Sequence, residues 1–313
     1  LQICYTGNSD TTLKLIDILK GNICDIQKIK RAAARAEGHF AIIINGTSAC
    51  CAITDHCRSS PIFFAENMVS NDAHLLRTKA RLDTAEPSGI RDASMAGFVT
   101  GPKTLFQGMK QLEAGSLAFW NKTSVEPEIK KHTVYQPITL ATSSKESMAD
   151  DFLSVLDHTI KDIVNTAGGR PIWIPLSGGL DSRLLLAKLA EHRYENLFAF
   201  SYGPKANDEA KVAEFIANTL GVRWKFYPTR RRDMQKFFAS ADRHLYWAYS
   251  DGLSSLPTFQ DLITLRKCHQ SGQLPENAIL VNGQTGDFIS GGHIPSSLMT
   301  SYVTKDMLLS LII

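Results

Sequence analysis

The chain has 313 residues, a net charge of +3 and a hydrophobic content of 43%. The small charge gives no reason to expect nucleic acid or a membrane surface as a partner, and no stretch approaches the roughly 18 apolar residues of a membrane helix. The length predicts about two domains, with enough apolar residues for a core in each. The six cysteines are spaced neither as a disulfide framework nor as a zinc site, which predicts reduced, mostly buried thiols in a cytoplasmic protein.

The first part of the chain has the pattern of antiparallel β-structure. Between residues 38 and 135, short apolar or alternating runs are separated by Gly, Asn, Asp and Pro. The predicted strands cover residues 40–44, 49–53, 62–64 and 117–120. Pro137 and the Ser/Thr-rich residues up to Ser144 are typical of a linker. We therefore expect one domain in residues 1–137 and a second in residues 138–313.

The second part of the chain alternates between helical and strand patterns. A capping box at residues 143–146 begins a predicted helix, and Gly168 and Gly169 end it. The further predicted helices cover residues 182–193, 208–220, 233–244 and 258–269. The predicted strands cover residues 172–176, 197–202, 224–227 and 279–281. Such alternation predicts an α/β fold, in which a parallel sheet carries helices on both faces.

The most informative motif joins the strand at residues 172–176 to the helix that follows it. The strand ends in Ser177-Gly178-Gly179, and the helical pattern starts at Asp181-Ser182. Glycines let a backbone approach a ligand closely, and the first N–H groups of a helix favour negative charge, so this segment predicts an anion site. The segment is not a P-loop, because no Gly-Lys pair occurs in the chain. An ordinary glycine-rich turn is the alternative.

The sequence Ser-Gly-Gly-x-Asp-Ser resembles the pyrophosphate loop of N-type ATP pyrophosphatases, which cleave ATP between the α and β phosphates and transfer AMP. A second glycine-rich turn, within residues 278–295, resembles the second signature of the asparagine synthetase family. The positions that match this signature are Gly283, Asp287, Gly291 and Gly292. Two positions depart from it, because Gln284 and Phe288 stand where the family usually has Glu.

The resemblance implies a site for ATP and Mg²⁺ in a Rossmann-like ATP pyrophosphatase domain over residues 138–313. Asp181 and Asp287 each follow a predicted strand and would hold Mg²⁺ against the leaving pyrophosphate, because Mg²⁺ prefers carboxylate and phosphate oxygens. A plain helix cap for Asp181 and a turn-forming role for Asp287 are the alternatives. The residues implied in binding ATP or its pyrophosphate are Leu176, Ser177, Gly178, Gly179, Asp181, Ser182, Ser201 and Gly283.

The first part of the chain also resembles the asparagine synthetase family, at residues 9–11, 37–41, 55–64 and 104–115. That family begins with a class II glutamine amidotransferase domain, an N-terminal-nucleophile fold of stacked antiparallel sheets. The resemblance implies an α+β fold of this type for residues 1–137. The family's nucleophile is an N-terminal Cys, whereas this sequence starts with Leu1 and ends in an apolar run. We therefore expect a fragment that lacks both ends of the family's chain and does not itself hydrolyse glutamine.

The resemblance implies ATP-dependent, AMP-forming amide synthesis on a small-molecule carboxylate, through an acyl-adenylate, with glutamine or ammonia as the nitrogen source. In the family, the Glu that matches Gln284 takes a proton from the incoming ammonium, and a neutral amide cannot act as that base. Either another group such as Glu209 is the base, or the substrate is not aspartate; we favour a changed substrate, held by Gln284. The alternatives are a ligase that amidates or cyclises a different carboxylate, and a non-catalytic ATP-binding scaffold. A homodimer is left open.

Overall fold

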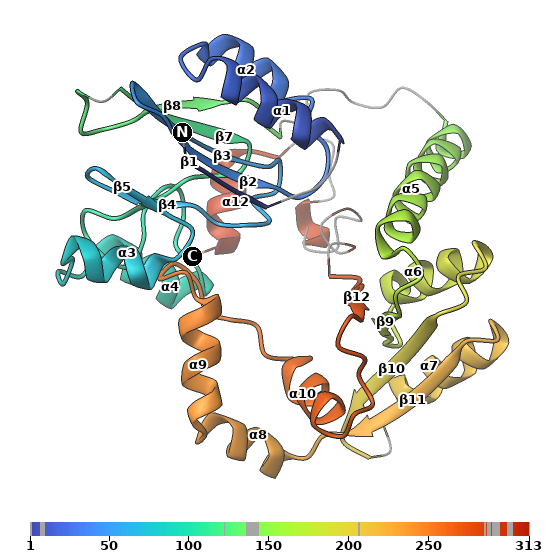
Figure 1. Ribbon diagram of the computed structural model, residues 1–313. Helices are drawn as coiled ribbons and strands as arrows, with labels where there is room; N and C mark the ends of the chain where they lie inside the picture. The colour runs from blue at the N-terminus through green and yellow to red at the C-terminus, as the bar shows by residue number, and fades with distance from the viewer. Residues whose placement is uncertain are drawn as a thin grey trace. The chain divides into compact units, whose positions relative to one another are not determined.

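The computed structural model divides the chain into two compact units (Figure 1). The first unit comprises Leu1–Leu140 and Ser240–Thr258, and the second comprises Ala141–Ala239 and Phe259–Ile313. The structure describes residues 2–6, 10–121, 123–135, 144–205, 207–284, 286, 289, 295–298 and 303–312. Within these ranges, every helix is too short or too polar to span a bilayer.

Among its described residues, the first unit contains two antiparallel sheets, one with the strand order β1-β2-β3-β7-β8 and one with the order β5-β4-β6. The strands are β1 (Gln2–Thr6), β2 (Ala41–Asn45), β3 (Ala49–Thr54), β4 (Phe63–Ala65), β5 (Met68–Ser70), β6 (Lys110–Gln111), β7 (Ser116–Asn121) and β8 (Glu128–Lys131). The four strands predicted for this part are confirmed to within one residue at each end. The helices α1 (Asp10–Gly21), α2 (Ile26–Ala33), α3 (Ala73–Ala80) and α4 (Pro87–Ala96) were not predicted.

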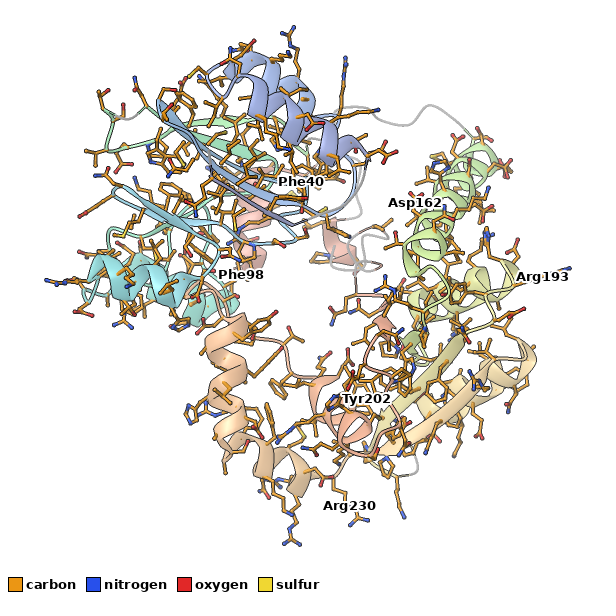
Figure 2. The ribbon with its side chains drawn as sticks, in the orientation of Figure 1. Phe40, Phe98, Asp162, Arg193, Tyr202 and Arg230 are labelled. Carbon is orange, nitrogen blue, oxygen red and sulfur yellow. The ribbon has the colours of Figure 1, made fainter. Side chains whose placement is uncertain are left out.

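The central strands of the larger sheet bury side chains on both faces, because side chains alternate in direction along each strand. Ile42 and Ile44 of β2 pack with residues of α1 and α2 and with Phe40, which is fully buried (Figure 2). Ala41 points the other way, into a core that it shares with Phe64 of β4. The two sheets are therefore stacked, with α1 and α2 on the outer face of the larger sheet. The assignment of this unit to the N-terminal-nucleophile class stays a prediction.

One predicted helix, over residues 233–244, is wrong because the structure has two helices there. These are α8 (Arg231–Phe238) in the second unit and α9 (Ala241–Ser250) in the first. The break falls at Ser240, whose backbone is extended (φ −94°, ψ 157°) and takes the N-cap position of α9. The apolar periodicity continues across the break, so it does not reveal where one helix stops and the next starts.

The segment of residues 240–258 is tied to the rest of the first unit by backbone hydrogen bonds. The Val99 N–H donates to the Ser254 carbonyl (2.7 Å), and the Leu105 N–H donates to the Leu253 carbonyl (2.8 Å). These bonds explain why the segment groups with residues that precede it by more than a hundred positions. The predicted domain boundary at residue 138 stays a prediction.

Within its described residues, the second unit contains a parallel sheet with the strand order β11-β10-β9-β12. The strands are β9 (Ile172–Pro175), β10 (Leu197–Gly203), β11 (Arg223–Pro228) and β12 (Ile279–Leu280). Besides α8, the helical segments are α5 (Lys145–Ala167), α6 (Leu180–Glu191), α7 (Asp208–Thr219), α10 (Leu262–Gln270), η1 (Ser296–Leu298) and α12 (Lys305–Ile312). Ile174 packs with residues of α5, α6 and α7 on one face, and Trp173 packs with Cys268 of α10 on the other. The predicted parallel sheet with helices on both faces is confirmed.

The ends of α5 follow the sequence signals, with one shift. The helix ends at Gly168, which takes the left-handed conformation (φ 54°) that glycine adopts without strain. Its N-cap is Ser144, whose Oγ accepts the Ser147 N–H (3.2 Å). The cap is therefore one residue later than the predicted capping box. The predicted helix over 258–269 is also shifted, because α10 begins at Leu262.

The cysteines are less buried than the sequence predicted. All six lie in the described part of the chain and are free. Cys4, Cys24 and Cys57 are exposed, whereas Cys51 and Cys268 are buried. The prediction of mostly buried thiols is therefore wrong, because exposed strand edges and loops carry half of them.

Candidate functional site

A cavity of about 320 Å³ opens at the C-terminal ends of the parallel strands. Leu176 and Ser177 follow β9, Ser201 lies near the end of β10, and Gly283 and Gln284 follow β12, and all five line the cavity. The strand order places β10 and β11 on one side of β9 and β12 on the other. Open α/β sheets bind ligands at the point where the strand order reverses in this way. The fold therefore brings the two predicted motifs to one place.

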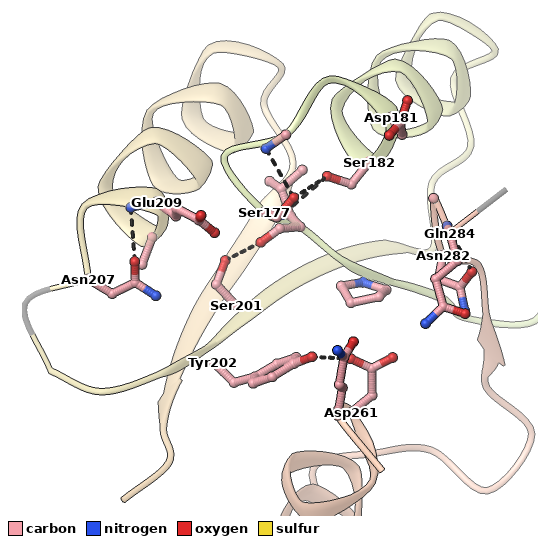
Figure 3. Close-up of a pocket in the computed structure, with 16 residues that line it drawn as sticks. Ser177, Asp181, Ser182, Ser201, Tyr202, Asn207, Glu209, Asp261, Asn282 and Gln284 are labelled. Carbon is pink, nitrogen blue, oxygen red and sulfur yellow. Dashed lines mark hydrogen bonds between the residues drawn. The ribbon is translucent and has the colours of Figure 1, made fainter. Parts of the chain in front are cut away.

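The loop between β9 and α6 is held by its own serines (Figure 3). The Ser177 N–H donates to Ser182 Oγ (3.1 Å), and the two hydroxyl oxygens are 3.1 Å apart. The Gly179 N–H donates to Ser177 Oγ (3.1 Å). Gly179 takes the N-cap position of α6 and makes no side-chain cap bond. The start of α6 therefore has the positive end of a helix dipole without a capping side chain, as an anion site requires.

Arg183 fixes the carbonyl side of the same loop. Its Nε donates to the Gly179 carbonyl (3.0 Å), and its second terminal nitrogen donates to the Gly178 carbonyl. Arg183 therefore engages the carbonyls of Gly178 and Gly179, whereas the amides of Ser177 and Gly179 are bonded to serine hydroxyls within the loop. This residue was not predicted, because its role depends on a contact within the first turn of α6 and not on the motif itself.

The second glycine turn packs directly against the start of α6. A Cβ added at Gly283 would lie 2.9 Å from the Ser182 amide nitrogen and 3.0 Å from Asp181 Cβ. A Cβ at Gly286 would lie only 2.1 Å from Asp181 Cγ. Only glycine allows this approach, since real Cβ contacts are longer. The two motifs are about a hundred residues apart in the sequence and touch in the structure. Asp287 lies outside the described residues, so its pairing with Asp181 stays a prediction.

Acidic side chains line the cavity. Asp181 is half-buried, Glu209 is exposed at the start of α7, and Asp261 is half-buried at the start of α10. Among the described lining residues there is no Lys or Arg. A polyphosphate could bind here only together with cations, because uncompensated like charges repel strongly at short range.

Tyr202 and Asp261 form a contact that the sequence did not predict. The Tyr202 hydroxyl donates to Asp261 Oδ1 (2.5 Å), as Figure 3 shows. Burial, followed by this hydrogen bond, raises the pKa of Tyr202 above its ordinary value. Asp261 was predicted to lie inside a helix over residues 258–269, whereas it is the N-cap residue of α10 and lies beside the cavity.

Ser201, one of the predicted ATP-binding residues, is buried at the junction of the strands. Its hydroxyl donates to the Leu176 carbonyl (2.6 Å) and accepts the Trp224 indole N–H (3.0 Å). It lines the cavity, but the hydroxyl proton is already engaged. Gln284 is exposed at the cavity rim, where its N–H donates to Asn282 Oδ1 (3.3 Å).

The carboxylates that line the cavity suit Mg²⁺ bound together with phosphates. Among the described residues, no three His, Cys, Asp or Glu side chains gather closely enough to hold a metal ion by themselves. Mg²⁺, however, is usually held by one or two carboxylates, with water and substrate phosphates as the other ligands. Asp181, at the start of α6 and at the cavity wall, meets that requirement for one carboxylate.

A comparison with known protein families matches part of the chain. Residues 153–294 match the asparagine synthase family, and this range contains both glycine motifs. These residues therefore hold an asparagine synthase domain. The match does not extend to residues 1–137, so the predicted glutamine amidotransferase domain stays a prediction. No curated protein matches the chain.

Solved structures with partial similarity include two NAD synthetases. The NH3-dependent NAD synthetase from Campylobacter jejuni has 15% sequence identity and a TM-score of 0.32, with 45% of this chain and 59% of that chain covered. The glutamine-dependent NAD+ synthetase from Acinetobacter baumannii has 12% identity and a TM-score of 0.34, with 97% and 72% covered. A predicted tRNA methyltransferase subunit from Methanocaldococcus jannaschii has 17% identity and a TM-score of 0.23, with 45% and 61% covered. The chain thus spans about three fifths of the first and third of these proteins.

Proposed function

We propose that the protein is a ligase that activates a carboxylate with ATP and then forms an amide. A carboxylate oxygen attacks the α-phosphorus, the bond to the β-phosphate oxygen breaks, and pyrophosphate leaves. An amine nitrogen then attacks the acyl carbon of the adenylate, AMP departs with the bonding electrons, and the nitrogen gives up a proton. The observation that carries this proposal is the contact of the second glycine turn with Asp181, within the asparagine synthase match.

The residues of the loop supply binding for the pyrophosphate. In this proposal Ser177, Gly178, Gly179 and Ser182 donate hydrogen bonds to its oxygens, with Leu176, Ser201 and Gly283 forming the adjoining wall. Asp181 and Asp287 would hold Mg²⁺, which when bound neutralises charge on the β- and γ-phosphates. Catalysis in such transfers depends mainly on fixed donors and charges that are already in place.

We also propose that the substrate is not aspartate. The side chain of Gln284 is a neutral amide and cannot act as a base at neutral pH. The described residues that line the cavity include no Lys or Arg. A dicarboxylate would bring a second negative charge next to Asp181, Glu209 and Asp261 without a cation to receive it. The lining is instead rich in amides, including Gln260, Asn282 and Gln284. Such side chains suit a single carboxylate on a molecule with hydroxyl, amide or amine groups, of which sugar acids are one class.

For the first unit, we propose a class II glutamine amidotransferase-like domain of the N-terminal-nucleophile type. Its stacked antiparallel sheets, with helices on the outer face of the larger one, support this assignment. The proposed division remains 1–137 and 138–313, with ammonia or glutamine as the nitrogen source. We further propose a cytoplasmic location, based on the free cysteines.

ATP–pyrophosphate exchange tests this function. The purified protein is assayed with Mg²⁺, ATP, labelled pyrophosphate and a panel of aspartate, sugar acids and other carboxylates. We expect exchange with at least one carboxylate and a loss of about 10²-fold or more in Asp181→Asn, because phosphate charge is then uncompensated. The matched control is Asp162→Asn, the same change on the exposed side of α5 (Figure 2). The absence of exchange with every carboxylate would favour the non-catalytic scaffold, and aspartate-selective exchange with asparagine as product would overturn the changed substrate.

A further inference from the structure

Asp261 keeps one carboxylate oxygen open beside the cavity at the ends of the parallel strands. The residue is half-buried at the N-cap position of α10, and its side chain makes no cap bond. Its Oδ1 accepts the Tyr202 hydroxyl (2.5 Å), as Figure 3 shows. Its Oδ2 has no partner among the described residues and is not buried. One oxygen is therefore fixed, whereas the other is accessible to a ligand in the cavity that Asp261 lines.

The Tyr202 hydroxyl acts as a donor to this carboxylate and holds its orientation. Burial, followed by the hydrogen bond to Asp261, raises the pKa of Tyr202, so the hydroxyl keeps its proton at neutral pH. The bond joins the end of β10 to the start of α10. A hydrogen bond to an ionised acceptor is stronger than one between neutral groups, so it fixes the carboxylate in one direction.

The charge of the cavity favours a cation at the open oxygen. The described lining includes Asp181, Glu209 and Asp261 but no Lys or Arg. In the proposed function Asp181 faces Mg²⁺, and Glu209 is an exposed residue whose carboxylate makes no hydrogen bond among the described residues. Asp261 is thus a half-buried, oriented carboxylate that the phosphate chemistry leaves unused. A nearby positive charge stabilises such a carboxylate in its ionised form.

Amide synthesis brings a cation of this kind into the cavity. Ammonia and primary amines are protonated at neutral pH, and the nitrogen must give up a proton as it bonds to the acyl carbon. The neutral amide of Gln284 cannot take that proton. A carboxylate can both attract the ammonium group and accept the proton from it.

We propose that Asp261 binds the nitrogen nucleophile as an ammonium group, from ammonia or from a primary amine, and accepts its proton. This inference rests on the proposed function. One N–H bond breaks and its proton moves to Oδ2, while the electron pair left on nitrogen forms the bond to the acyl carbon. The bond from that carbon to the AMP oxygen then breaks, and AMP keeps the electrons. The nitrogen releases its second proton to solvent, and Oδ2 returns the first.

Two assays on the full chain separate this role from the binding of ATP. The first is ATP–pyrophosphate exchange, which needs no amine. The second is amide formation from the carboxylate that supports exchange, with ammonium chloride, ethylamine or hydroxylamine in separate arms. Hydroxylamine is uncharged at neutral pH, so it needs neither a counter-charge nor a base. The variants are Asp261→Asn and Asp261→Glu, and Asp162→Asn in α5 is the matched control.

We expect Asp261→Asn to exchange pyrophosphate at the rate of the parent protein. Its kcat/KM for the charged amine should fall by about 10²-fold, as when a general base is removed. Hydroxylamine should serve the variant and the parent protein equally well, and Asp261→Glu should recover part of the loss. The arm that the parent protein uses, ammonium or ethylamine, identifies the source of the nitrogen.

The other outcomes contradict the inference. Loss of exchange in Asp261→Asn would assign the carboxylate to ATP or Mg²⁺, and an equal loss with hydroxylamine would show a structural effect only. Unchanged use of the charged amine by Asp261→Asn, or its use by neither protein, would overturn the inference without affecting the adenylation step. Absence of exchange in the parent protein with every carboxylate would refute the proposed function, and this inference with it.

Discussion

Gly286→Ala should disable the proposed ATP site without unfolding the protein. The new Cβ would lie 2.1 Å from Asp181 Cγ, whereas carbon atoms in contact are about 3.5 Å apart or more. Either Asp181 or the turn must therefore move by more than about 1 Å. A displacement of about 1 Å in a reacting site costs about 10²-fold in rate, which corresponds to about 2.7 kcal/mol of transition-state stabilisation. We expect this loss in ATP–pyrophosphate exchange.

The same substitution at Gly21 provides the control. A Cβ at Gly21, at the end of α1, meets no atom within 4 Å, so Gly21→Ala should exchange pyrophosphate like the parent protein. Circular dichroism should show both variants folded, because the clash at position 286 is confined to a surface turn and the start of α6. An unchanged exchange rate in Gly286→Ala would refute the reasoning that close approach to Asp181 requires glycine there.

Two further predictions concern stability in the first unit. The Asp55 carboxylate accepts the Phe40 N–H (2.9 Å) and the Cys57 N–H (2.8 Å), so Asp55→Asn should lower the free energy of unfolding by about 2–4 kcal/mol in urea titrations. Burial raises the pKa of Asp55, but the hydrogen bonds from Ser59, Cys57 and Phe40 together bring it below the ordinary carboxyl value. The carboxylate therefore stabilises the fold at pH values above that ordinary value, and this stabilisation is lost as the pH falls through the lowered pKa. A stability difference between parent and variant that persists in strong acid would contradict this account. His132 is buried and its Nε2 is 2.8 Å from the Thr54 carbonyl, to which it donates. Burial is the main cause that lowers the pKa of His132, so the unfolded chain binds the proton more readily and stability should fall as the pH drops below about 6.5; an NMR titration that places the pKa of His132 above the ordinary value would show this to be wrong.

Local sequence patterns correctly predicted most helices and strands of the second unit. The strands β9 to β12 and the helices α5 to α7 follow apolar patterns, and α5 ends at Gly168, and both are local signals. For the same reason the Ser177–Ser182 segment was correctly placed between a strand and a helix. Chemical roles for these residues remain predictions, because a role depends on the ligand.

Local patterns failed where tertiary contacts decide the outcome. The break between α8 and α9 interrupts a continuous helical pattern, and α1 to α4 were not predicted. The Tyr202–Asp261 bond joins β10 to a residue 59 positions later. No periodicity indicates such a pair, because it depends on which helix covers which face of the sheet.

The sequence by itself determined the kind of turn at residues 177–182 and at residues 283–286, because glycine spacing and the flanking strand and helix patterns are properties of adjacent residues. Only the tertiary structure decided that β12 lies beside β9, and therefore that Gly283 and Gly286 close against Asp181. Strand order and burial arise from many long-range contacts acting together, and such contacts leave no local pattern to read.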